Sequence, residues 1–101
     1  MEVSKEKLAE LKKQHFGVVA IEVAEEEQKY VAYLKRPNTE ALSNFNKIGK
    51  TNEMLAMTTL VNECWLEGDS IIKADGFLMA AVGGEFLKGF NQNRNTTTIK
   101  N

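Results

Sequence analysis

The sequence predicts an α+β fold in which an N-terminal helix and a β-hairpin pack against a C-terminal part of three helices. Two short runs rich in strand-forming residues lie close together in the first third of the chain. A charged segment of helical pattern precedes them, and three segments with apolar residues at helical spacing follow. The 101 residues suffice for one domain. We place that domain at residues 1–90 and expect residues 91–101 to form a polar, flexible tail.

The first expected element is a helix over residues 4–14. Ser4 suits the N-cap position, where its side chain can accept a hydrogen bond from a free backbone N–H of the first turn. Leu8 and Leu11 give this helix only a narrow apolar stripe. The helix therefore has to lie on a larger surface to remain folded.

Two strands are expected next, at residues 17–23 and 30–34. The polar residues 24–29 between them form a connector long enough for a hairpin loop. Pro37 ends the second strand, because proline cannot donate a hydrogen bond to the sheet. A hairpin alone is only marginally stable in water, so one of its faces must pack against helices.

Three helices follow the hairpin. Asn38 or Thr39 caps the first, which Gly49 ends. The second covers residues 53–66, and the third is capped by Asp75.

The last helix contains the pair Gly83-Gly84, and each glycine weakens a helix interior by about 1 kcal/mol. Close packing against a neighbouring helix would compensate for this cost. The pair belongs to neither of the glycine-rich phosphate-binding patterns. Beyond it, residues 91–101 hold no large apolar residue until Ile99, which is why we expect a flexible tail there.

Composition and charge exclude several classes of function. Hydrophobic residues make up 43% of the chain and charged residues 27%, and the formal net charge is −1. This balance gives no general attraction to nucleic acid or acidic membranes. No apolar run approaches the roughly 20 residues of a membrane span. The chain starts with a charged helical pattern and no signal peptide, so we expect a cytoplasmic protein.

Residues with catalytic chemistry are scarce. The chain holds one histidine, His15, and one cysteine, Cys64. A dyad of the two is conceivable, but Cys64 falls on the apolar stripe of its helix, where cysteine usually acts as a small hydrophobic residue. The run Glu25-Glu26-Glu27 lacks the ligand spacing of a calcium loop and reads as a solvated turn. We therefore expect no enzyme, no cofactor and no metal site, although chemistry by carboxylates alone would leave no pattern in a sequence.

Large apolar residues of the helices are the remaining candidates for function. A chain of this length needs nearly all of them in its core. We expect Trp65, Phe86 and Phe90 to stay available for binding another protein, since aromatic side chains often anchor such contacts. The full set of candidates also contains Met54, Met57 and Phe77.

Several short motifs between residues 17 and 88 support a resemblance to a known family. They are a hairpin ending in Tyr-Leu-Lys-Arg-Pro at residues 33–37, a helix start at 39–42, and a helix closing on Asn-Glu-Cys-Trp-Leu-Glu-Gly-Asp at 62–69. In these features the chain resembles the tail assembly chaperones of long-tailed bacteriophages. The resemblance implies a protein that associates with the tail tape-measure protein and helps tube subunits to polymerise around it. Residues 91–101 match no part of that pattern.

Two other functions remain open. The chain could be a virion structural or tail-completion subunit, or a small host-directed inhibitor that acts by binding a protein. In the last case the acidic residues 25–27 would contact a basic target. The sequence is also compatible with a homo-oligomer.

Overall fold

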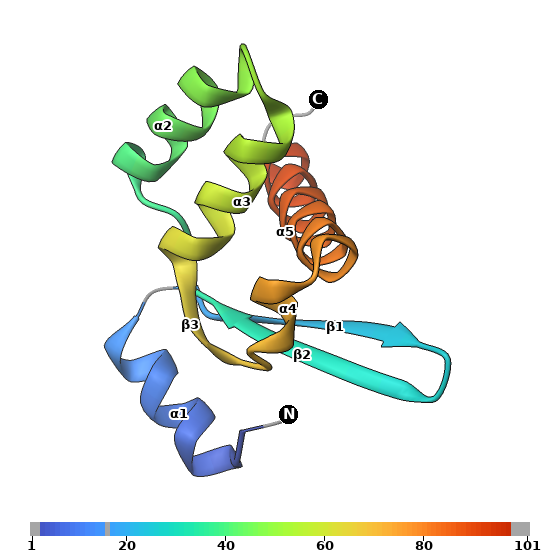
Figure 1. Cartoon of the computed structure of the whole chain (residues 1–101). Coiled ribbons are helices and arrows are strands. Elements are labelled where there is room, and N and C mark those ends of the chain that lie inside the picture. Colours follow the sequence, from blue (N-terminus) through green and yellow to red (C-terminus); the bar gives the residue numbers. More distant parts are fainter. Residues whose placement is uncertain (1–2, 16, 98–101) are drawn as a thin grey trace.

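The computed structural model describes residues 3–15 and 17–97, with the backbone alone for residues 89–97. Within these residues the chain forms, in order, α1 (Lys5–Gln14), β1 (Val19–Glu25), β2 (Gln28–Leu34), α2 (Thr39–Gly49), α3 (Glu53–Cys64), β3 (Trp65–Gly68), α4 (Ile71–Ala74) and α5 (Gly76–Thr97) (Figure 1). The α+β class predicted from the sequence is confirmed.

The described strands form one antiparallel sheet in the order β1-β2-β3. The expected hairpin is present, but its strands reach further into the connector than the sequence indicated. Glu25 lies directly opposite Gln28, so only residues 26 and 27 remain in the turn. Glu26 adopts a φ of 56°, a left-handed conformation that is uncommon outside glycine.

β3 is a strand that the sequence did not predict. Residues 65 and 66 were expected to continue the preceding helix, and this was wrong. The helix ends at Cys64, whose carbonyl accepts a hydrogen bond of 2.9 Å from the Lys35 N–H. Trp65 then turns to extended dihedrals and pairs with Leu34 of β2. Pairing with the hairpin thus overrides the local helical preference of this segment.

Helices cover the two faces of the sheet unequally, with α1 on one side and α3, α4 and α5 on the other (Figure 1). The side of α3 to α5 holds the larger cluster of buried residues, which we call the main core. Its buried members are Ile21, Ala32, Leu34, Ala41, Leu60, Val61, Cys64, Ile72, Leu78, Met79, Val82 and Phe86. Among the described residues, the α1 side buries Leu11, Val31 and Tyr33, and four half-buried residues pack against them: Val3, Leu8, Val18 and Leu66.

Four helix starts follow the capping rules. Ser4, Asn38, Asn52 and Asp75 each accept backbone hydrogen bonds of 2.8–3.1 Å from residues two or three positions further along. The caps expected at Ser4 and Asp75 are confirmed. Where the sequence left two candidates for α2, the structure uses Asn38.

The two glycines of α5 differ in their surroundings. A Cβ atom added to Gly83 would overlap the Met57 side chain of α3, so the predicted close helix packing is confirmed there. A Cβ atom on Gly84 would meet nothing within 4 Å. The backbone of α5 also continues to Thr97, past residue 90, where the sequence placed the end of the domain. Ile99 lies outside the described residues.

Candidate protein-binding groove

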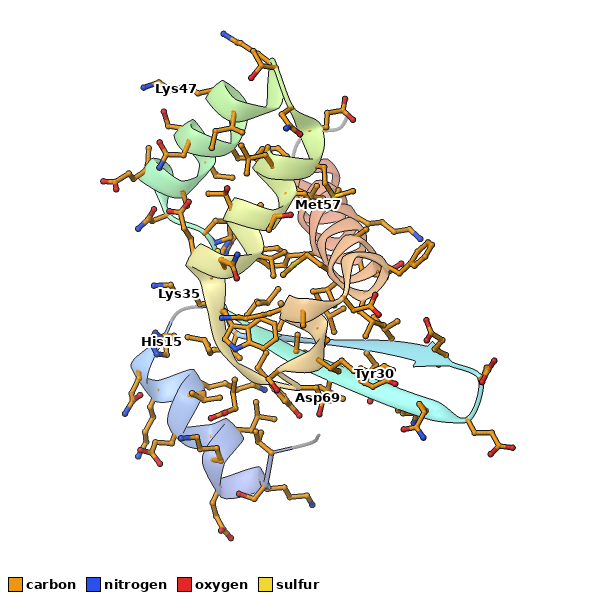
Figure 2. The ribbon with its side chains drawn as sticks, in the orientation of Figure 1. His15, Tyr30, Lys35, Lys47, Met57 and Asp69 are labelled. Carbon is orange, nitrogen blue, oxygen red and sulfur yellow. The ribbon has the colours of Figure 1, made fainter. Side chains whose placement is uncertain are left out.

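A groove of about 720 Å³ lies at the end of the helical layer, where α2, α3 and α5 come together. It is lined by Phe45, Asn46, Gly49, Lys50, Glu53, Ala56, Met57 and Leu87. Met57 lies between α3 and α5 in the part of the molecule away from the sheet (Figure 2). We call this feature the three-helix groove.

Small residues let the helices approach one another beneath this groove. A Cβ atom on Gly49 would lie 3.8 Å from the Cβ of Ala56, an ordinary contact distance between α2 and α3. On the other side of α3, Gly83 leaves room for Met57. α3 therefore packs against both α2 and α5. The larger side chains of Phe45 and Leu87 line the groove from the two outer helices.

The lining is apolar at its centre and polar at its rim. Phe45, Ala56, Met57 and Leu87 are buried or half-buried, whereas Asn46, Lys50 and Glu53 are exposed. An apolar centre favours apolar side chains of a partner, because their burial removes surface from water. Met57 makes part of the lining adaptable, because its unbranched side chain can change conformation to fit partners of different shape.

Exposed apolar side chains also occur on α3 outside the groove lining. Met54 is 54% exposed and Leu55 51% exposed on the first turn of the helix. Met54 precedes Met57 by three residues, which places the two on the same side of the helix.

Phe77, at the start of α5, is 86% exposed. The expectation that the core would take up Met54 and Phe77 was therefore wrong.

The structure places the three predicted partner-binding residues in different surroundings. Trp65 is half-buried against the main core, and Lys73 Nζ lies 4.7 Å from the centroid of its ring. Phe86 is 7% exposed and belongs to the main core. The side chain of Phe90 lies outside the described residues. Among the predicted residues that are described, none lines the groove.

Met57 belonged to the wider set of candidates, but the other groove residues were missed because their sequence pattern resembles that of core residues. Phe45 and Met57 occupy helical spacing that a buried stripe would also produce. The signal that points to them is the contact of glycines with residues of α3, Gly49 with Ala56 and Gly83 with Met57. These contacts are visible only once the helices are placed in space.

Cys64 and His15 differ in accessibility. Cys64 is 1% exposed, and burial raises the pKa of its thiol to about 11, opposed by the charge of Lys35 and reinforced by Glu63. A protonated thiol is a poor nucleophile. His15 is half-buried and follows the last residue of α1. Within the described part of the chain, no group of three or more His, Cys, Asp or Glu residues could hold a metal ion.

Across residues 3–15 and 17–97, none of the helices combines the length and the apolar character needed to cross a membrane. No protein-family model, curated protein or solved structure matches the chain.

Proposed function

We propose that this chain is a non-enzymatic assembly factor of the phage tail chaperone type, and that it covers an apolar helical segment of the tape-measure protein. The observation that carries the proposal is the three-helix groove, which has a volume of about 720 Å³ and an apolar centre. A groove between helices suits a partner helix that inserts apolar side chains from successive turns. Residues 62–68 of the motif behind the resemblance lie in α3 and β3, and the same α3 helix lines the groove.

The distribution of polar groups favours a protein partner over a small molecule. Small-molecule sites usually bring several polar groups together at fixed positions inside a pocket. Here the polar lining residues are Asn46, Lys50 and Glu53, and all three are exposed. The opposite charges of Lys50 and Glu53 suit the charged residues that flank the apolar face of an amphipathic helix.

An exposed apolar residue beside the groove fits the same role. Met54 extends apolar surface beyond the groove lining, because it is 54% exposed and lies on the same side of α3 as Met57. Larger exposed apolar patches on a folded protein commonly mark a site of contact with another protein. An assembly factor needs such a surface to recognise a partner that has not yet been incorporated.

Co-expression with the tape-measure protein tests the proposal. The wild-type chain should increase the soluble fraction of that protein and co-purify with it. Asn46→Trp should abolish co-purification, because the added side chain would fill the groove from an exposed position. Lys47→Trp is the matched control, since Lys47 is the next residue of α2, is exposed and points away from α3 and α5 (Figure 2).

Thermal unfolding of both variants should show that the fold is retained. A tape-measure protein that gains no solubility from the wild-type chain would contradict the proposal. Equal co-purification of Asn46→Trp and the wild type would show that binding occurs elsewhere.

A further inference from the structure

β1 forms an edge of the sheet, and no other described strand pairs with its outer side. The hairpin turn extends beyond the helices (Figure 1). Ala20, Glu22 and Ala24 of this strand are exposed, so no helix covers them. An uncovered edge strand is a ready template for pairing with another extended chain.

The register identifies which backbone groups face this open edge. In an antiparallel pair, directly opposed residues alternate between exchanging two hydrogen bonds and exchanging none. Val31 lies opposite Glu22, but its N–H donates to Asp69 Oδ2 at 2.9 Å and its carbonyl accepts from the Asp69 N–H at 2.9 Å. Both groups of Val31 therefore point toward β3. The N–H and carbonyl of Glu22 must point in the opposite direction, toward the open edge.

The same alternation extends along the strand. Ala20 and Ala24 are each two residues from Glu22, so their N–H and carbonyl groups also point outward. Ile21 and Val23 instead direct theirs toward β2. β1 thus presents three donors and three acceptors in the regular spacing that an added strand would require.

Charge and side-chain pattern define what such a strand should contain. The hairpin region 18–34 carries four glutamates, at positions 22 and 25–27, against the single lysine at position 29. Glu22 projects from the sheet face that α1 shares, while the apolar Ile21 and Val23 belong to the opposite face, where they pack on the main core. An added strand would therefore place basic residues beside Glu22 and apolar residues beside Ile21 and Val23.

We propose that the β1 edge binds an extended segment of a partner protein in which basic and apolar residues alternate, adding a fourth strand to the sheet. A second copy of this chain fits poorly. Its longest symmetric antiparallel pairing, centred on residue 22, would oppose two Glu22 side chains, and like charges directly opposite destabilise a strand pair. The proposal does not depend on the three-helix groove, which involves none of these residues.

Amide hydrogen exchange followed by NMR tests this binding. The probe is a synthetic octapeptide that alternates valine and lysine, added to the full chain. At saturation it should slow exchange of the Ala20, Glu22 and Ala24 amides by about tenfold or more. A matched peptide alternating valine and glutamate should give less protection at the same concentration.

Charge reversal at Glu22 provides a second test of the same proposal. Glu22→Lys should weaken binding of the lysine peptide by about three- to tenfold and improve binding of the glutamate peptide. Glu40→Lys, at an exposed position of α2 that lines neither β1 nor the groove, is the control that should leave both affinities unchanged. Equal binding of the two peptides, or no protection at the three outward amides, would overturn the proposal. Concentration-dependent protection of these amides without peptide would overturn it in favour of self-association.

Discussion

The two faces of the sheet are held by very different amounts of buried surface. The face under α3, α4 and α5 belongs to the main core, which joins residues from nearly every described element. The face under α1 buries a cluster of three, to which the helix itself contributes the buried Leu11 and the half-buried Leu8. Beside that cluster, the β1 part of the same face is left open at Ala20, Glu22 and Ala24.

This difference implies that the main core is stable and that α1 is held only weakly on the sheet. Regions with few buried apolar contacts open at lower free energy than the core that they cover. We therefore expect α1 to detach without unfolding the main core. Since the three-helix groove is built on the main core, partner binding should persist when α1 is loosened.

The largest effect should follow truncation in the main core. Leu34 is fully buried, and Leu34→Ala should lower the free energy of unfolding by about 2–5 kcal/mol, through lost burial and the cavity left behind. Leu11→Ala should cost less, because its small cluster can relax as α1 moves. Urea denaturation of both variants measures the difference. An equal or larger loss for Leu11→Ala would show that the two faces contribute equally.

Substitutions at Gly83 and Gly84 test whether the close contact of α5 with α3 is needed for the packing of the main core. Gly83→Ala should destabilise the protein by about 1–3 kcal/mol, because the new methyl group must displace Met57. Gly84→Ala is the matched control, and there the better helix propensity should stabilise by up to about 1 kcal/mol. Thermal unfolding distinguishes the two. Similar changes in both variants would mean that α5 can shift away from α3 at little cost.

These regions also differ in how far the sequence could predict them. Helix starts were predictable because Ser4 and Asp75 satisfy N–H groups within their own first turn, which is a local effect. β3 was not, because Trp65 becomes extended through pairing with a strand some thirty residues earlier in the chain. Likewise, nothing local distinguishes Phe77, which is exposed, from Phe86, which is buried. Which side of a helix faces the core depends on where its neighbours lie.

A smaller effect is expected at the N-terminus of α1. The Ser4 hydroxyl accepts a hydrogen bond of 3.1 Å from the Lys7 N–H, and Ser4→Ala should cost about 1 kcal/mol of helix stability. Because we expect α1 to open separately from the main core, amide exchange should quicken in α1 alone. Faster exchange in α3 as well would indicate that α1 and the main core unfold together.

The last prediction concerns a change of stability with pH at Cys64. Burial raises the pKa of its thiol from 9.0 to about 11 in the folded protein, so the folded state favours the protonated form. This contribution is fully present below pH 9 and is lost as the pH rises from 9 toward 11. At pH 10 it amounts to about 1 kcal/mol. The difference in unfolding free energy between wild type and Cys64→Ala should therefore change between pH 7 and 10, and a constant difference would contradict burial of the thiol.

Hydrogen exchange of the full chain, measured with and without the tape-measure protein, tests the central claim most directly. Binding in the three-helix groove should slow exchange over the second half of α2 and the first half of α3 and leave α1 unchanged. Protection confined to α1, or no protection anywhere in the chain, would contradict the groove as the binding site.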